Sequence, residues 1–374
     1  MICSLVQVLF FSLAASLSAQ RQAITIDVTT PEGRALRQVA DEPDDAKKVA
    51  FMEQFLAQYP KHEGAAWVYS QMAASYTRLG QFDKALAAAE KGLALDPFDM
   101  ETAYAAVKAA EAKKDADAVR KWAVQTSDLA RKAAQAPKGG EEDDDAYKQR
   151  VDGAKRVDLY AEYALFEAAV QAGEAAQRVE LLKTLEERAP ESSYLSQASG
   201  MYFQALAQSG DMPGAVRLAE KLIPKNQANE EMLAIAADFY LRQNKEPQKV
   251  LEYSAKLIAA VNARSRPDGV ADADWQKYRT HFLGWGQWMT GIVYGVQARY
   301  ADCNKVLREA LPLLEGNDEF KAGALFNLGI ANSHLRNVAD ATRFFEQCAA
   351  IKSPYQPPCA DNLKSLRSNY RVIK

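Results

Sequence analysis

Two stripes of apolar residues with a glycine between them constrain the fold of this chain more than any other feature. The first stripe recurs at the spacing of one helix face and comprises Tyr69, Met72, Ala73, Tyr76 and Leu79. Gly80 follows it, and glycine readily takes the left-handed conformation that ends many helices. The second stripe comprises Phe82, Ala85, Leu86, Ala89 and Leu93, and it ends at Asp96-Pro97. The pattern predicts a helical hairpin in which small alanines let the two helices approach closely.

This spacing resembles the tetratricopeptide repeat (TPR), a helix–turn–helix unit of about 34 residues. The residues at matching offsets are Tyr69, Met72, Ala73, Tyr76, Gly80, Phe82, Ala85 and Pro97. The sequence departs from the pattern where Tyr69 replaces the usual tryptophan and Ala89 replaces an aromatic residue. The resemblance implies a stack of antiparallel helix pairs whose first helices line a concave surface that binds a partner.

Further copies of the pattern follow along the chain. A strong copy near the C-terminus has Leu325, Leu328, Gly329, Ala341, Phe345 and Cys348 at the family's offsets. Weaker copies turn at Gly173, Gly210 and Asn244, and another copy, from Gly291 to Ala310, is offset by 38 residues from the strong one. We therefore expect an all-α, TPR-like right-handed α-solenoid of roughly six or seven antiparallel helix pairs.

The chain divides into seven segments. Residues 1–19 hold a short apolar run that predicts a signal peptide cleaved after Ala19, although no basic residue precedes the run. An N-terminal extension, 20–43, contains a short extended piece at 23–28 and a helix that starts at Thr30. TPR-like repeats then occupy 44–133, 147–263 and 275–374, separated by an acidic flexible loop, 134–146, and a linker, 264–274. Leu363, Leu366 and Tyr370 give the final helix one apolar face, which predicts a C-terminal capping helix.

Composition argues against several classes of partner. The net charge is −3, from 46 basic and 49 acidic residues, so no basic excess would attract nucleic acid. Beyond residue 19, no segment is apolar and long enough to cross a membrane, so we expect no integral membrane segment after signal cleavage. The five acids from Glu141 to Asp145 lack the alternating spacing of a calcium loop and predict a solvated turn.

The sequence offers no catalytic or metal-binding motif. None of His62, His281 and His334 has a second histidine or cysteine at ligand spacing, and we expect no catalytic residue, metal or cofactor. Cys303, Cys348 and Cys359 remain after signal cleavage. Cys348 and Cys359 stand at facing ends of successive helices, so they form either a disulfide or two separately buried thiols.

An aromatic cluster in the C-terminal half is the candidate binding site. It comprises Trp275, Tyr278, Phe282, Trp285, Trp288, Met289 and Ile292. Such a stripe on a helix can face the core or a partner. Alignment with the repeat pattern assigns to the concave surface Trp285, Trp288, Ile292, Phe326, Ile330 and His334.

These features favour an exported scaffold, periplasmic or secreted, that binds a partner protein or peptide on its concave face. Two alternatives stay open: the helical-repeat body of an envelope enzyme, and a purely structural unit that self-assembles. The oligomeric state cannot be inferred from the pattern.

Overall fold

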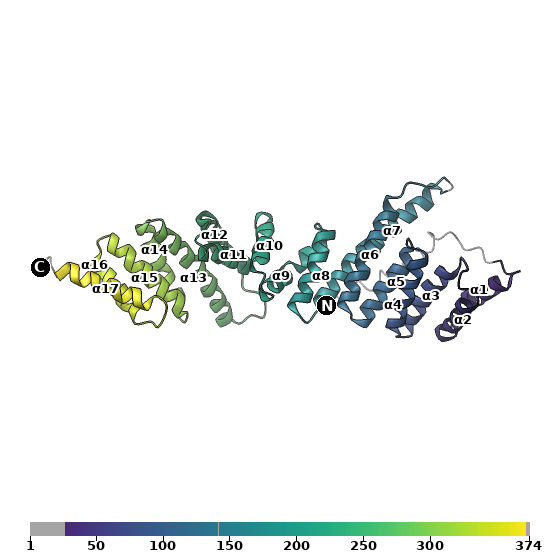
Figure 1. Cartoon of the computed structure of the whole chain (residues 1–374). Helices are drawn as coiled ribbons and strands as arrows, with labels where there is room; N and C mark the ends of the chain where they lie inside the picture. Colours follow the sequence, from purple (N-terminus) through teal and green to yellow (C-terminus); the bar gives the residue numbers. More distant parts are fainter. Residues whose placement is uncertain (1–26, 141, 372–374) are drawn as a thin grey trace. The chain divides into compact units, whose positions relative to one another are not determined.

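The computed structural model describes residues 27–140 and 142–371, and every regular element within them is helical (Figure 1). The expected extended piece at 23–28 lies largely outside these residues, and the predicted signal peptide lies wholly outside them. The chain divides between Ser209 and Gly210 into two compact units, and each is described by itself. The prediction of an all-α repeat fold is confirmed.

The first unit contains nine α-helices in its described residues. They are α1 (Pro31–Asp41), α2 (Asp45–Gln58), α3 (Ala65–Arg78), α4 (Phe82–Leu95), α5 (Met100–Lys113), α6 (Ala116–Gln135), α7 (Asp144–Gln171), α8 (Ala175–Arg188) and α9 (Ser193–Gln208). Each helix packs against the next one along the chain, and α3 also contacts α5. The predicted start at Thr30 is confirmed, because its hydroxyl accepts a hydrogen bond from the Gly33 amide at 3.0 Å.

The second unit contains eight α-helices in its described residues. They are α10 (Met212–Leu222), α11 (Glu230–Arg242), α12 (Pro247–Ala263), α13 (Asp272–Val296), α14 (Tyr300–Ala310), α15 (Asp318–His334), α16 (Val338–Ala349) and α17 (Gln356–Arg371). Short 3₁₀ turns follow α10 and α14. Helix α13 contacts both α11 and α15 as well as its neighbours in sequence. We call the side formed by α11, α13 and α15 the inner face of this unit.

Left-handed residues occupy several of the turns between successive helices. Gly80 and Gly210 have φ angles of 70° and 86°, as the sequence pattern predicts, and Asn244 has a φ of 51°. Ala298 and Arg336 take the same conformation without the freedom of glycine. The pairs also need close helix contact: a Cβ on Gly329 would lie 2.5 Å from the Phe345 ring. The repeat is therefore fixed by backbone conformation at the turns and by small residues between the helices.

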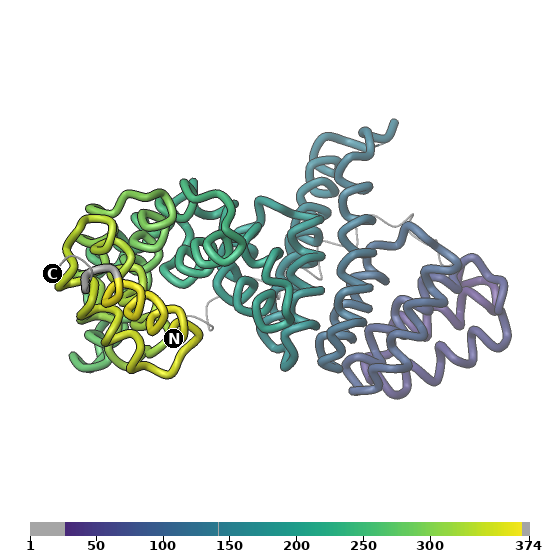
Figure 2. The backbone as a smooth tube through the Cα atoms, turned by 60° about the vertical axis from the view of Figure 1, so that its left-hand side comes forward, coloured from purple at the N-terminus to yellow at the C-terminus, as the bar shows by residue number. Residues whose placement is uncertain are grey.

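Helices α6 and α7 form a hairpin that extends beyond its neighbours in the first unit (Figure 2). They have 20 and 28 residues, whereas α3, α4 and α5 have 14 each. The connection spans residues 136–143, which is shorter than the expected loop 134–146. It is shorter because Asp143 accepts the Ala146 amide at 2.7 Å as an N-cap, and Asp144 and Asp145 occupy the first helical turn, where negative charge is favourable.

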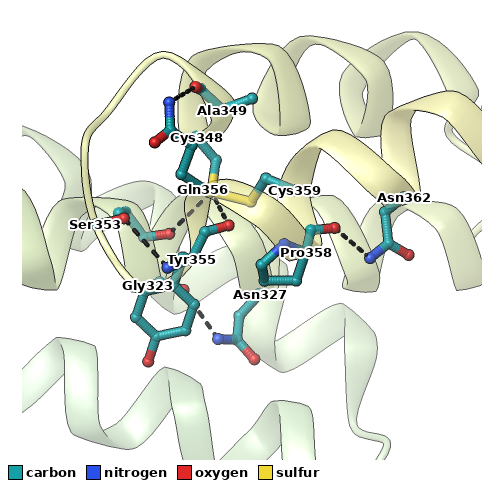
Figure 3. Close-up of a disulfide and its surroundings, with 11 residues drawn as sticks. Gly323, Asn327, Cys348, Ala349, Ser353, Tyr355, Gln356, Pro358, Cys359 and Asn362 are labelled. Carbon is teal, nitrogen blue, oxygen red and sulfur yellow. Dashed lines mark hydrogen bonds between the residues drawn. A yellow bond between two sulfur atoms is a disulfide. The ribbon is translucent and has the colours of Figure 1, made fainter.

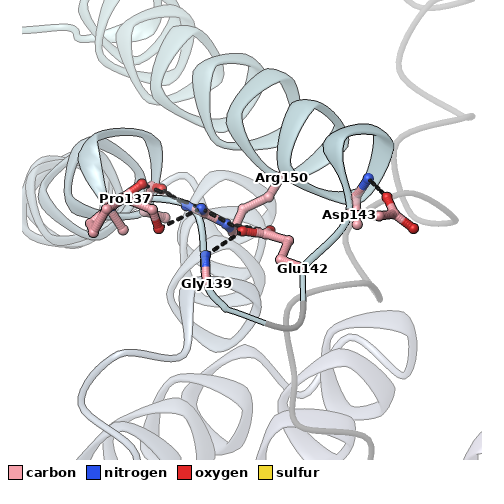
Figure 4. Close-up of polar contacts among 8 residues, drawn as sticks. Pro137, Gly139, Glu142, Asp143 and Arg150 are labelled. Atoms are coloured by element: carbon pink, nitrogen blue, oxygen red, sulfur yellow. Dashed lines mark hydrogen bonds and ion pairs between the residues drawn. The ribbon is translucent and has the colours of Figure 1, made fainter.

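Arg150 holds this connection in place through hydrogen bonds (Figure 4). Its guanidinium donates to both Glu142 carboxylate oxygens, at 2.9 and 3.0 Å, and to the carbonyls of Ala133, Ala136 and Pro137. Glu142 in turn accepts the Gly139 amide at 3.2 Å. The arginine therefore satisfies carbonyls at the C-terminal end of α6, which would otherwise lack intrahelical donors.

A repeated tyrosine–glutamate bond joins successive helix pairs. Tyr76 on α3 donates to Glu53 on α2 at 2.7 Å, and Tyr202 on α9 donates to Glu186 on α8 at 3.1 Å. In the second unit, Glu220 on α10 accepts hydrogen bonds from Tyr240 (2.9 Å), Tyr253 (3.0 Å) and Lys249 (2.7 Å). Burial opposes the charge on Glu220, but these three donors outweigh it and lower the pKa of the carboxyl.

Helix α17 packs against α16, as expected of a capping helix. Leu363 and Leu366 are half-buried, whereas Lys364 and Arg367 are exposed. Cys348 and Cys359 form a disulfide with a Cα–Cα distance of 5.9 Å, which decides between the two predicted alternatives. Among the described residues, no helix has both the length and the apolar character to span a bilayer.

Candidate functional site: an aromatic inner face

Long helix α13 brings a row of aromatic rings to the inner face of the second unit. Tyr278 stacks on Trp275 at 5.3 Å and meets Phe282 edge-on at 5.0 Å. Phe282 lies parallel to Trp285 at 6.5 Å, and the Trp285 ring lies 5.9 Å from Phe320 on α15. The row is continuous because the residues recur three or four apart along α13 and therefore share one side of the helix.

Three rings extend this row onto and beyond α15. Phe320 stacks on Trp288 at 4.5 Å, and Phe326 lies 5.7 Å from Tyr355, which belongs to the segment between α16 and α17. Tyr355 and Asn327 flank Gly323 (Figure 3), and a Cβ on Gly323 would lie 3.2 Å from the Tyr355 ring. We call the half-buried members of this set the aromatic face; they are Tyr278, Phe282, Trp285, Phe320, Phe326 and Tyr355.

The six predicted site residues do not all lie in equivalent positions. Trp285, Ile292, Phe326 and Ile330 are half-buried, so each offers part of its side chain to a partner. Trp288 is only 7% exposed and is a core residue. His334 is exposed, but its ring stacks at 4.1 Å on Tyr300 at the start of α14 rather than on a ring of α13.

Two aromatic-face residues were missed by the sequence prediction. Phe320 stands 38 residues after Phe282, the same offset that relates the last two copies of the repeat, so the offset could have found it. Tyr355 lies outside the repeat helices, and its only sequence signal is its place between two cysteines.

An ion pair borders the N-terminal end of the aromatic face. Arg264 donates to Glu230 at 2.8 Å and to the Tyr278 hydroxyl at 3.2 Å. Burial opposes the charge on Glu230, but the Arg264 guanidinium outweighs it and lowers the pKa of the carboxyl. Burial, with the nearby Glu230 carboxylate, raises the pKa of Tyr278 to about 12. Tyr278 is therefore a neutral hydrogen-bonding ring at neutral pH.

Two of the three indole N–H groups of the region are buried and have no hydrogen-bond partner among the described residues. They belong to Trp285 and Trp288. A buried donor without an acceptor costs about 1–3 kcal/mol. The aromatic face thus contains hydrogen-bonding capacity that the fold does not use.

A second group of rings lies in the first unit, and sequence reasoning missed it as a cluster. It joins α5, α7 and α9 through Tyr104, Tyr160, Tyr163, Phe166 and Tyr194. Its centre, Tyr160, is buried, accepts a hydrogen bond from Lys108 and donates one to Glu111. Burial and Glu111 raise the pKa of Tyr160, so this phenol stays protonated and fills the core rather than acting as a base.

Two observations on the described residues concern thiol and metal chemistry. Burial raises the pKa of the free Cys303 thiol to about 11, which leaves it neutral at physiological pH. No three histidine, cysteine or carboxylate side chains are gathered to hold a metal within the described residues.

Comparison with known proteins supports one repeat directly. Residues 66–99 match the tetratricopeptide repeat model, so the chain contains a TPR at the hairpin formed by α3 and α4. Fold and repeat together define the class as a helical-repeat protein with at least one TPR. No curated protein matches the sequence.

Three solved structures are similar to this chain. The TPR domain of P58(IPK) is 11% identical, with 92% of this chain and 99% of that chain covered and a TM-score of 0.31. The Cut9–Hcn1 hetero-tetramer of APC/C is 13% identical, with 91% of this chain and 56% of that chain covered and a TM-score of 0.36. Yeast Tom70 is 13% identical, with 93% of this chain and 66% of that chain covered and a TM-score of 0.33. These TM-scores are too low to support an argument about function.

Proposed function

We propose that this protein is a non-catalytic scaffold that binds a segment of a partner protein on the aromatic face of its second unit. The observation that carries the proposal is the continuous row of half-buried rings across α13 and α15. Rings of this kind supply large contact area with little side-chain entropy to lose, as the dominant residues of protein interfaces do. Trp285 lies near the middle of the row and is its central contact.

The unpaired indole donors support a peptide ligand. A polypeptide carries one carbonyl acceptor per residue, so a bound segment could supply an acceptor to the Trp285 N–H after a small side-chain shift. Ile292 and Ile330 would extend the contact as apolar flanks. Trp288 is buried under the aromatic face and fixes the position of Phe320, because the two rings stack.

Export is the second part of the proposal. The apolar run before Ala19 motivates it, and the disulfide fits an oxidising, extracytoplasmic compartment such as the bacterial periplasm. The test is to express the chain from Met1 in a bacterial host and to measure the mass of the protein recovered from the periplasm. A mass lacking residues 1–19 is expected, and an uncleaved protein retained in the cytoplasm would contradict export.

The binding test starts with a partner captured from the native envelope and then purified. Trp285→Ala should weaken the measured affinity by about 30-fold, the equivalent of about 2 kcal/mol for a central interface residue. Phe98→Ala is the matched control, because Phe98 is a large ring, 74% exposed, in the turn between α4 and α5. Equal affinity losses in the two variants, or none in Trp285→Ala, would exclude the aromatic face as the binding surface.

A further inference from the structure

The segment between α16 and α17 contributes one ring to the aromatic face and is closed by the disulfide. We define residues 349–355, the last residue of α16 and the segment that follows it, as the strap (Figure 3). Cys348 precedes the strap at the end of α16, and Cys359 follows in the first turn of α17. Because the disulfide joins the two sides, the strap cannot straighten while the bond is intact.

Tyr355 is tied closely to the disulfide through its backbone. Its carbonyl oxygen accepts the Cys359 amide at 3.0 Å and lies 3.7 Å from the Cys348 sulfur. The Gln356 side chain, at the start of α17, donates to the Ala349 carbonyl at 3.0 Å and so joins the two sides of the strap. The position of the Tyr355 backbone therefore depends on the distance between the two cysteines.

The Tyr355 side chain reaches from the strap to the inner face. Its ring lies 5.7 Å from Phe326 and packs against Gly323, where a larger residue would collide with it. The Trp288 indole nitrogen lies against the same glycine, 3.3 Å from the position a Cβ would take. Tyr355 thus packs beside Phe326, and its ring and the Trp288 indole nitrogen approach Gly323 together. Among the described residues this buried nitrogen has no hydrogen-bond partner.

We propose that the strap is a redox-dependent cover: the Cys348–Cys359 disulfide holds Tyr355 against Phe326 and Gly323, beside the Trp288 N–H, and reduction of the bond releases it. A dithiol reductant supplies two electrons and two protons, so that its own sulfurs become a cyclic disulfide and the protein gains two thiols. Both cysteines are 0% exposed, so reduction requires transient opening of α17. An oxidising compartment keeps the strap closed, whereas a reducing compartment leaves it open.

The proposal assigns the strap a role in regulating the aromatic face. As control of partner binding it rests on the proposed function, because an open strap presents more of Phe326 to a partner. The proposed movement of Tyr355 itself does not depend on any partner. A test on the isolated full-length chain therefore separates its failure from failure of the proposed function.

Acrylamide quenching of tryptophan fluorescence tests the movement. The oxidised protein is compared with protein treated with dithiothreitol, and the gain of two thiols is verified in denaturant. Reduction should increase quenching and shift the emission to longer wavelength, because the nitrogen edge of the Trp288 indole loses its Tyr355 neighbour beside Gly323 while Phe320 still covers the ring face. Both changes should disappear in Trp288→Phe, which removes the reporting ring and keeps an aromatic residue in its place.

Tyr355→Ala, with the disulfide intact, should show the same increase, and subsequent reduction should add nothing. The control is Tyr300→Ala, which removes a half-buried tyrosine of the same unit that stacks on His334 instead. It should leave quenching unchanged. If reduction also lowers the far-ultraviolet circular dichroism signal of the helices, the reduced protein has partly unfolded. The proposal is then tested by the quenching of the oxidised Tyr355→Ala protein. Unchanged quenching in that variant, or in reduced protein that stays folded, would overturn the proposal.

Discussion

Replacing Glu220 with alanine removes one acceptor that three side chains of the second unit share. Tyr240, Tyr253 and Lys249 donate to the same carboxylate oxygen from α11 and α12, so the substitution removes three hydrogen bonds between α10 and the next helix pair. A hydrogen bond to a charged group contributes about 1.5–3 kcal/mol. Side chains of Glu220 and Lys249 are 26% and 38% exposed, so water replaces part of each bond. We expect a loss of about 2–4 kcal/mol in the free energy of unfolding.

Urea unfolding followed by circular dichroism measures this loss. The control is Glu252→Ala on α12, because Glu252 forms an exposed pair with Lys256 at 3.8 Å. Such a pair contributes about 0–1 kcal/mol, so the control should stay near wild type. Equal unfolding midpoints for the two variants would refute the argument that Glu220 joins the helix pairs.

The pH dependence supplies a second observation on Glu220. The folded-state pKa is lower than that of the unfolded chain, so the stabilisation is complete above the unfolded pKa of about 4.3 and is lost as the pH falls through the lower folded value. The difference in stability between wild type and Glu220→Gln should therefore shrink as the solution is made more acidic. A difference that grows on acidification would contradict the assigned direction.

Three other substitutions test separate parts of the structure. Trp288→Ala should destabilise by about 3–5 kcal/mol, measured by urea unfolding, since the ring is buried against Phe320; a surface-like loss below about 0.5 kcal/mol would contradict that core position. Changing Cys348 and Cys359 together to serine should cost about 2–3 kcal/mol in the same assay, and no loss would show that the bond adds nothing to stability. Arg150→Ala should speed amide hydrogen exchange across 136–143, and unchanged exchange would show that the arginine does not order this connection.

The turns show what the sequence could predict about the fold. Gly80, Gly210 and Asn244 identify three turns because glycine and asparagine tolerate left-handed backbone. Ala298 and Arg336 adopt the same conformation, and no local preference marks them. In those pairs the contacts between helices impose the turn, and such contacts depend on residues distant in sequence.

The aromatic site was also predictable only in part, because burial there depends on residues distant in sequence. Trp285 and Trp288 are three residues apart and share one side of α13, so periodicity cannot distinguish them. Their burial differs because Phe320 of α15 stacks directly over Trp288 at 4.5 Å and approaches Trp285 only to 5.9 Å. The division between core and surface is thus decided by a neighbouring helix rather than by the stripe itself.

The connection between α6 and α7 is shorter than the acidic composition predicts, and charged residues are the reason. A run of acids predicts a solvated loop, but Asp143 to Asp145 instead begin α7 as its cap and first turn. The carboxylate of Glu142 is held by Arg150, eight residues further along the chain. Composition identified the turn, and side-chain hydrogen bonds determined its length.

Hydrogen exchange of the full chain, measured with and without the captured partner, tests the central claim most directly. The account predicts that the partner slows amide exchange in α13 and α15, over residues 278–292 and 320–330. In α14 and α16, amide exchange should change only at residues that contact α13 or α15. Protection confined to α14 and α16, or to the first unit, would contradict the claim that the aromatic face is the binding surface.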